Sequence, residues 1–424
     1  MPTQKKVHLK PIAYRFLVVS KLIITGLSVV SFGAFAQKTV NLNEAISYTL
    51  QQHPGLKSFS YMQKASEGMI EQASTSSPMT FSAEVEDAFG TGGYSGVSAM
   101  QTTLSISWLL ERDKIESRVN VANEKASMAK LNKSIKALNL AAETAKVFIT
   151  LLSQKEQLKL AKLARNQTKQ VLAEIKTRVI AGKVNVIDEL RAKAELSRKE
   201  LTVEDLFHEI QASKAQLAAQ WQGETDFVID GDLLTIPTIA QIETAYEKLK
   251  SNPRLKVFST QQKIAEAEIE LAKVNQKPAW SVNTGIKRNE FVDDYAVTAG
   301  ISIPFGSENR NRGRITALRA KQNQSSAESD ALYKRISTQL LLLTHKLKHN
   351  RHVIDGLSLE TIPALELASI KAGAAYKVGR YRYTDWYAVQ QELVTSQTEL
   401  IEAYTNIHLF TIELERLTGS SISM

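Results

Sequence analysis

The chain has 424 residues, with 53 lysine or arginine residues against 44 aspartate or glutamate residues, so its formal net charge at pH 7 is +9. It contains no cysteine, which excludes disulfides, thiolate metal sites and a lipid anchor on a cysteine at the mature N-terminus. The basic residues do not cluster with aromatic residues, so the sequence indicates no nucleic-acid partner.

Residues 1–36 are typical of a signal peptide. They contain five basic residues and no acidic one, and an apolar run from Leu22 ends in Ala34-Phe35-Ala36. This run is too short to cross a bilayer and signal peptidase accepts an A-x-A ending, so we expect cleavage; a retained anchor is the alternative. Removing the five basic residues lowers the formal charge from +9 to +4. The rest of the chain has no apolar run long enough to predict a membrane-spanning helix.

The remaining chain consists of two copies of one unit. At an offset of 199 residues, Glu44–Ala73 matches Glu243–Ala272 at 13 of 30 positions without a gap. The sequence therefore predicts a first repeat at residues 37–222, a linker at 223–240 and a second repeat at 241–424. In each repeat we expect a helix, a β-hairpin and a long pair of helices.

Two segments in each repeat alternate between apolar and polar residues, which indicates strands. They predict hairpins at about residues 79–109 and 279–305. Each strand has about the 9–11 residues that span a bilayer when tilted, with aromatic residues near the ends; two soluble hairpins are the alternative. Because four strands cannot close a barrel and open edges in lipid leave backbone groups unpaired, we expect several chains to share one barrel. The strand count allows a dimer, a trimer or a tetramer.

Each hairpin is followed by a long helical stretch. Residues 112–180 contain neither proline nor glycine, which predicts a helix about 100 Å long. A plain coiled coil is the alternative, but the sequence does not sustain its apolar seam. The second stretch begins near Gly313 and contains Pro363, where we expect a kink or the start of a new helix.

Both stretches lead into helix-to-helix turns at about residues 182–188 and 379–385, which correspond at an offset of 197. Gly182 and Gly379 are expected to end the incoming helices in a left-handed conformation. Asp188 and Asp385 follow where the outgoing helices start, and an interaction with the helix N-terminus alone would explain both.

The order and duplication of these features resemble the TolC-like outer-membrane efflux protein family, closest to its cation-efflux subgroup. The resemblance covers essentially all of the mature chain. Its motifs are His53-Pro54-Gly55-Leu56, Asn252-Pro253-Arg254-Leu255, Pro304-Phe305-Gly306, and Pro363 upstream of Tyr376-Lys377-Val378-Gly379. It implies a mainly α fold with a transmembrane β-barrel portion, in which a homotrimer forms a 12-stranded β-barrel continued by a 12-helix α-barrel.

The resemblance also implies a function. The chain would be an outer-membrane duct that extends into the periplasm and exports small molecules or metal cations. Its partners would be outer-membrane lipid, a periplasmic adaptor protein and an inner-membrane pump of RND or ABC type. The same duct could serve type I protein secretion, and a periplasmic coiled-coil adaptor or structural protein is an alternative from another class. The pump would supply the energy, so no cofactor is expected.

By motif position, the family's periplasmic tip and gate lie at the two turns. Family members close this tip at rest with acidic, tyrosine and arginine residues. The matching residues are Asp188, Tyr376, Arg380, Tyr381, Arg382 and Asp385. Tyr376 matches the constriction tyrosine, and Tyr381 stands where the family can place an arginine. We therefore expect Arg380 or Arg382 to supply the gating ion pair.

Candidate metal ligands are His345, His349 and His352, whose spacing places them on one face of a helix. Lysine and arginine residues crowd the same segment, so a solvated or packed helix face is the favoured interpretation. The sequence has no glycine-rich phosphate loop, no G-x-S-x-G and no H-E-x-x-H motif, and we expect no enzymatic activity.

Overall fold

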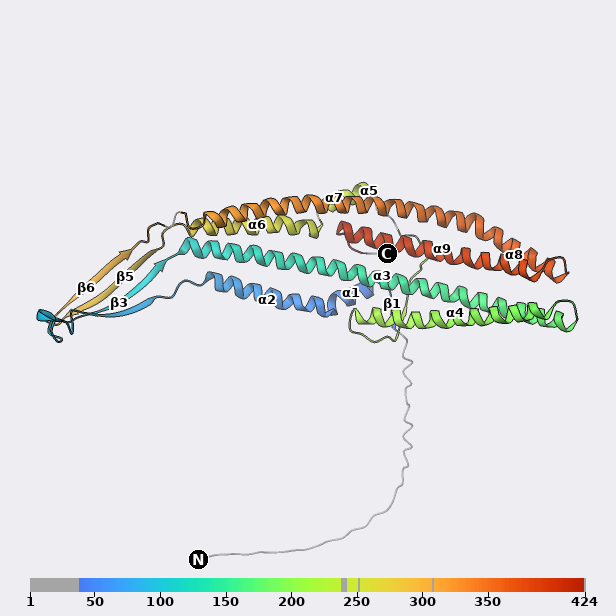
Figure 1. The fold of residues 1–424 in the computed structure, drawn as a ribbon, viewed down its shortest axis with the longest axis horizontal. Helices are drawn as coiled ribbons and strands as arrows, with labels where there is room; N and C mark the ends of the chain where they lie inside the picture. Colours follow the sequence, from blue (N-terminus) through green and yellow to red (C-terminus); the bar gives the residue numbers. More distant parts are fainter. Residues whose placement is uncertain (1–37, 238–241, 251, 307–308, 423–424) are drawn as a thin grey trace, which may run out of the picture. The chain divides into compact units, whose positions relative to one another are not determined.

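The computed structural model describes residues 38–237, 242–250, 252–306 and 309–422, and the predicted signal peptide lies outside them. The first half contains β1 (Lys38–Val40), α1 (Leu42–Gln52), α2 (Pro54–Ser74), β2 (Thr80–Glu86), the short η1 (Gly92–Tyr94), β3 (Gln101–Leu110), α3 (Arg112–Ile180) and α4 (Val186–Ala219). The second contains β4 (Phe227–Ile229), α5 (Ile242–Leu249), α6 (Pro253–Val274), β5 (Trp280–Asn289), β6 (Asp294–Ser302), α7 (Arg312–Gly356), η2 (Leu357–Thr361), α8 (Ile362–Lys377) and α9 (Tyr383–Thr418). Figure 1 shows these elements in chain order.

The second helix of each half begins at a proline in the same way. Pro54 and Pro253 occupy the first turns of α2 and α6, where a missing backbone N–H leaves no hydrogen bond unmade. The preceding side chain caps each helix, since His53 Nδ1 accepts from the N–H of Gly55 at 2.9 Å and Asn252 Oδ1 accepts from that of Arg254 at 2.7 Å. The duplicated motif therefore starts a helix in both halves.

The long helices have the bounds that their proline and glycine content predicts. α3 runs unbroken from Arg112 to Ile180. The second long stretch ends as an α-helix at Gly356, continues as a π-helical turn in which the N–H of Ile362 donates to the carbonyl of Leu357, and resumes as α8 with Pro363 in its first turn. Proline removes one hydrogen bond from a helix, and Pro363 lies in the first turn of α8, directly after the wider π-helical turn.

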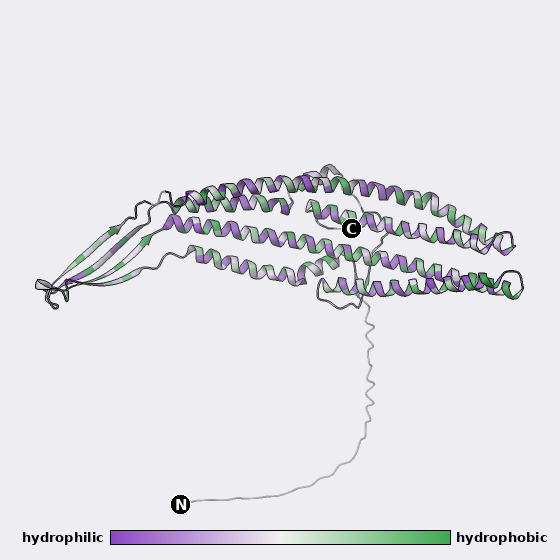
Figure 2. Ribbon diagram, in the orientation of Figure 1, coloured by the Kyte–Doolittle hydropathy of each residue, from purple (hydrophilic) through white to green (hydrophobic). Residues whose placement is uncertain are grey.

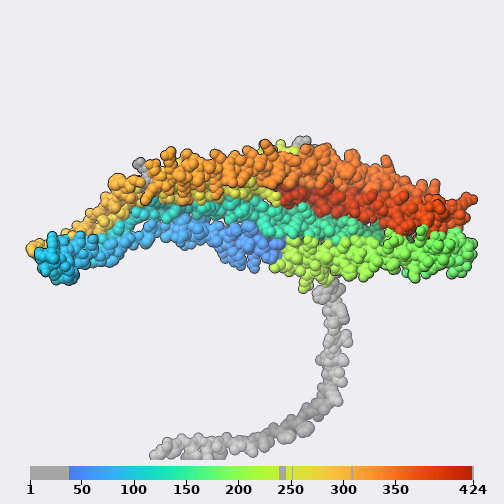
Figure 3. Space-filling model, viewed as in Figure 1, coloured from blue at the N-terminus to red at the C-terminus, as the bar shows by residue number. Residues whose placement is uncertain are grey.

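Apart from the short α5 and η1, the described helices pack as four neighbouring rows (Figure 3). The first row consists of α1, α2 and α4, the second of α3, the third of α6 and α9, and the fourth of α7, η2 and α8. α3 packs against the first row on one side and the third row on the other, and the third row packs against the fourth. Rows one and four are therefore the edges of this helical layer.

The largest hydrophobic core lies midway along α3. Phe148, Ile149 and Leu152 are almost fully buried there against α1, the end of α4 and the parallel pair β1–β4. Elsewhere the helices carry hydrophilic and hydrophobic residues along their whole length (Figure 2). No helix among the described residues is both long and apolar enough to cross a membrane.

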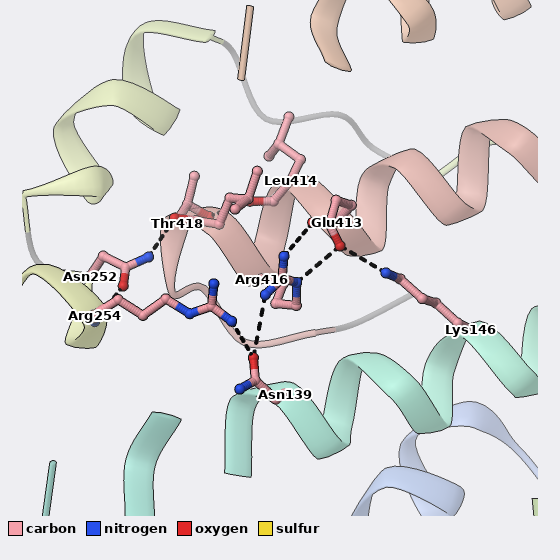
Figure 4. A network of polar contacts seen from close by, with 9 residues as sticks. Asn139, Lys146, Asn252, Arg254, Glu413, Leu414, Arg416 and Thr418 are labelled. Atoms are coloured by element: carbon pink, nitrogen blue, oxygen red, sulfur yellow. Dashed lines mark hydrogen bonds and ion pairs between the residues drawn. The ribbon is translucent and has the colours of Figure 1, made fainter. Parts of the chain in front are cut away.

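A polar network joins α3, α6 and α9 beside this core (Figure 4). Glu413 accepts hydrogen bonds from Arg416 and, at 2.8 Å, from Lys146 Nζ. Asn139 Oδ1 accepts from Arg254 at 2.8 Å and from Arg416 at 3.4 Å. One carboxylate and one amide oxygen thus hold three cationic side chains from three helices.

The four strands form one antiparallel sheet in the order β2-β3-β5-β6. The two hairpins meet through β3 and β5, which pair over ten residues from Gln101↔Asn289 to Leu110↔Trp280. β2 ends at Glu86, because Asp87 and Phe89 adopt positive φ angles of 57° and 60° and turn the chain.

The register places the apolar residues of all four strands on one face of the sheet. Directly paired residues lie on the same face, and one row runs from Phe81 through Ile106 and Thr284 to Ala299. The other members of this face include Ala83, Leu104, Ile286, Val297, Trp108, Val282 and Ile301. The opposite face carries Ser82, Ser105, Asn283 and Lys287. This arrangement extends the alternation of each single strand into one mainly apolar surface, which also carries Thr284 and Arg288.

Candidate functional site at the helix turns

Glycine ends the incoming helix of both turns in the left-handed conformation that the sequence predicts. Gly182 has a φ of 65° and Gly379 a φ of 76°. The N–H of Lys183 donates to the carbonyl of Arg178, and that of Arg380 to the carbonyl of Ala375, both at 2.9 Å. These bonds satisfy the last carbonyls of α3 and α8.

The outgoing helices begin differently in the two turns. Asn185 caps α4, because its side chain accepts from the N–H of Ile187 at 3.0 Å, whereas Arg382 precedes α9 and makes no side-chain cap. Asp188 and Asp385 occupy the third position of their helices, where a carboxylate interacts favourably with the helix N-terminus. The amide of Asn185, rather than the carboxylate of Asp188, thus caps the first turn.

Arg380 or Arg382 was expected to form an ion pair, and in the structure Arg382 does. Its Nε lies 3.2 Å from Asp385 Oδ2, within the same turn. The Arg382 side chain is 85% exposed, so solvent screens this pair and its contribution to stability is small. Arg380 and Tyr381 are exposed beside it.

Tyr376 lies in a hydrophobic cluster that joins α3, α4, α8 and α9 behind the turns. It is 2% exposed and stacks on Trp386, with ring centroids 5.1 Å apart. The cluster also contains Ala192, Ile175 and Tyr383. Burial raises the pKa of the Tyr376 hydroxyl, which has no hydrogen-bond partner among the described residues. In the single chain, Tyr376 is therefore a packed residue behind the two turns.

Arg178 connects the two turns, and it was not among the residues predicted from the sequence. It lies in the last turn of α3, donates to the carbonyl of Tyr376 at 2.7 Å and covers the Tyr376 ring at 4.6 Å. A basic residue in the last turn before Gly182 suits the helix C-terminus, which was its only signal in the sequence.

A second polar contact joins α4 to α9 near the same end. Glu195 is buried and accepts from Arg198 Nε at 2.9 Å and from Gln391 Nε2 at 3.3 Å. Burial acts to raise the pKa of Glu195, but the Tyr387 hydroxyl and Arg198 outweigh it, and the net shift is downward. The corresponding residue of the second repeat, Glu392, is exposed. The equivalent glutamates of the two repeats therefore differ in their environment: one is buried and the other is exposed.

The structure places the three candidate metal ligands on the surface of one helix. His345, His349 and His352 are all exposed on α7. Within the described residues, no three histidine, cysteine, aspartate or glutamate side chains are grouped closely enough to hold a metal ion.

Comparisons with known proteins agree with this architecture. The model of the outer membrane efflux protein family matches residues 46–222. The cobalt-zinc-cadmium resistance protein CzcC of Cupriavidus metallidurans is 22% identical over 310 residues, which are 72% of this chain and 74% of that protein. The outer membrane protein VceC of Vibrio cholerae has a similar structure, with a TM-score of 0.72 and 17% identity over 89% of this chain and 96% of that one. CusC gives a TM-score of 0.71 and 14% identity over 90% and 92% of the two chains.

The fold is therefore that of outer-membrane efflux channels, which combine an α-barrel with a β-barrel. The resemblance of this chain to the TolC-like outer-membrane efflux protein family, which the sequence predicted, is confirmed.

Proposed function

We propose that the chain is the outer-membrane duct of a tripartite efflux system and works as a homotrimer. The observation that carries this proposal is that both layers of the fold end in open edges. The sheet ends in β2 and β6, and the helical layer ends in rows one and four (Figure 3). Three copies would supply about twelve strands and twelve helical rows, which close the barrel that four strands leave open.

Rows one and four each carry exposed apolar residues at similar distances along the chain from the helix turns. On α4, Leu190 and Leu201 lie 8 and 19 residues beyond Gly182 and are 61% and 56% exposed. In the fourth row, Ile370 and Leu359 lie 9 and 20 residues before Gly379 and are 70% and 75% exposed. Residues 11 apart share a helix face, so each edge has an apolar stripe of two residues, and the two stripes lie at nearly the same distance from the turns. Row four of one copy would bury its stripe against row one of the next.

The same geometry supports a direction for the duct. The apolar face of the sheet would contact outer-membrane lipid, and the helices would extend into the periplasm with the turns at their far end. The exposed turns would then contact a periplasmic adaptor and an inner-membrane pump of RND or ABC type. The similarity to a cobalt-zinc-cadmium resistance protein favours divalent metal cations as cargo.

The turns would form the gate of the duct. Asp188, Tyr376, Arg380, Tyr381, Arg382 and Asp385 are the proposed tip residues. The exposed Arg382–Asp385 pair supports this role, because a weak surface pair is easily exchanged for contacts with another chain. Replacing Arg380 and Arg382 with alanine should raise the single-channel conductance of purified trimers, whereas Lys371→Ala, an exposed change on α8, should not. Equal conductance in both variants would exclude an arginine gate.

The proposed function is tested by location, oligomeric state and cargo together. The outer-membrane fraction should contain a band at trimer mass in an unheated gel. Deleting the gene should lower the tolerated concentrations of cobalt, zinc and cadmium, and the intact gene should restore them. A soluble monomer would refute the duct, while unchanged metal tolerance with a trimer present would refute only the cargo.

A further inference from the structure

A hollow of about 640 Å³ lies where the strands meet the helices. Its walls come from the end of β3, the first turns of α3, the end of α6 and the start of β5. α3 and α6 belong to the two inner rows, so packing copies edge to edge would leave this hollow open. Its volume falls within the range of small-molecule sites.

The hollow continues the apolar face of the sheet. Leu110 and Trp280 are the last directly paired residues of that face, and both line the hollow with 53% and 46% of their surface exposed. Val274 and Ile115 add apolar surface from the helices. A tryptophan at the end of an apolar band is typical of a membrane–water interface.

Among the described residues, two cationic side chains at the hollow form no direct ion pair, although Lys114 interacts electrostatically with Glu111. Lys277 pairs with Asp113 at 3.6 Å, but Arg112 and Lys114 make no ion pair within the part of the chain that the structure describes. Glu111, on the same wall, is buried and accepts from the N–H of Ser77, so it fixes the strand-to-helix connection. The exposed Glu116 is the remaining acidic side chain of the lining.

We propose that this hollow binds the phosphodiester headgroup of a glycerophospholipid from the periplasmic leaflet of the outer membrane. Arg112 and Lys114 would contact the phosphate, and the acyl chains would lie along Leu110 and Trp280. The inference rests on the proposed orientation of the sheet in the membrane. The positive charges of Arg112 and Lys114 favour a phosphate group. The apolar wall is continuous with the proposed lipid-facing surface, so it favours a lipid over a soluble phosphate ester.

Native mass spectrometry of the full-length protein, released from nanodiscs of phosphatidylglycerol and phosphatidylethanolamine, tests this site. The spectrum reports the oligomer and its retained lipids together. Arg112→Gln with Lys114→Gln should lower lipid retention by about five-fold for each charge removed. The exchange Arg112→Lys with Lys114→Arg should retain the lipid, because both charges remain. Lys130→Gln with Lys133→Gln, on exposed residues further along α3, is the matched control and should also retain it.

Each result bears on the proposal. Trimers of the double glutamine variant that keep the wild-type number of lipids would overturn the lipid site and leave the duct intact. Soluble glycerol phosphate that displaces the lipid would overturn the choice of a lipid ligand. A soluble monomer would overturn the duct and the lipid site together.

Discussion

At the scale of single residues, Tyr383 links the packing behind the helix turns to pH. It is 5% exposed, and burial, followed by the charges of Glu195 and Asp188, raises its pKa to about 12, while Arg191 acts in the opposite direction. Because the unfolded chain loses this proton near pH 10, the folded state binds the proton more tightly between about pH 10 and 12. The stabilisation is therefore complete below pH 10 and is lost as the pH rises through 12.

Replacing Tyr383 with phenylalanine should remove this part of the pH dependence. We expect the wild-type protein to lose about 2–3 kcal/mol more than the variant between pH 10 and 12. Denaturant unfolding across that range, followed by the helical signal, measures the difference. Tyr61→Phe changes an exposed tyrosine on α2 and should follow the wild-type profile. Parallel profiles for wild type and Tyr383→Phe would contradict the expected effect of burial.

At the scale of the elements, Glu413 is the carboxylate of the polar network that joins α3, α6 and α9 (Figure 4). Burial alone would raise its pKa, but hydrogen bonds from Arg416 and Lys146 outweigh burial and lower it. Ionised Glu413 therefore stabilises the folded chain above the pKa of an unfolded glutamate. This stabilisation is lost as the pH falls from that value through the lower pKa of the folded state. Burial lowers the pKa of Arg254, and nearby Arg416 lowers it further, which indicates that positive charge is in excess here.

Glu413→Gln should destabilise this junction, because it removes the negative charge and leaves Lys146 and Arg416 without their acidic partner. We expect a loss of about 2–4 kcal/mol at pH 7, measured by denaturant unfolding, that shrinks as the pH falls below about 4. Glu402→Gln on the same helix changes an exposed carboxylate and should cost little. A loss that did not depend on pH would mean that packing, and not charge, explains the effect.

The strand register gives a test with adjacent positions of β3. Ile106 lies on the apolar face opposite Phe81, and Ser105 on the polar face opposite Ser82. Lysine at a lipid-facing position costs about 2–4 kcal/mol near the middle of a bilayer. Ile106→Lys should therefore lower the amount of trimer in the outer-membrane fraction, while Ser105→Lys should not. If both variants assembled equally well, the apolar face would not contact lipid.

Local sequence patterns predicted the helices and strands better than they predicted the contacts between them. The bounds of α3 and the interruption at Pro363 follow from which residues a helix tolerates, and the faces of the strands follow from alternation. The pairing of β3 with β5 joins residues far apart in the chain, and no local pattern encodes it. Likewise, a basic residue near a helix end has many possible partners, so the contact of Arg178 with Tyr376 appeared only in the folded chain.

At the scale of the whole molecule, the duplicated unit explains how identical chains can close a ring. Each copy presents row four on one edge and row one on the other, and these are different surfaces. Contacts between different surfaces of identical chains form closed rings when the rotation between neighbours closes. The stripes Leu190–Leu201 and Leu359–Ile370 would then meet only between neighbouring chains.

Ile370→Glu should weaken this contact, because it places an unpaired carboxylate in an apolar interface. We expect the trimer to dissociate at least about ten-fold more readily in size-exclusion chromatography with light scattering. Leu163→Glu introduces the same charge at a leucine of α3 that is 51% exposed and lies in an inner row, so it should leave the trimer intact. Adding Leu190→Lys to Ile370→Glu should restore the trimer, since each carboxylate would face a lysine of the neighbouring chain. If that second change gave no recovery, the two stripes would not be partners and the ring would have to close through other residues of the edge rows.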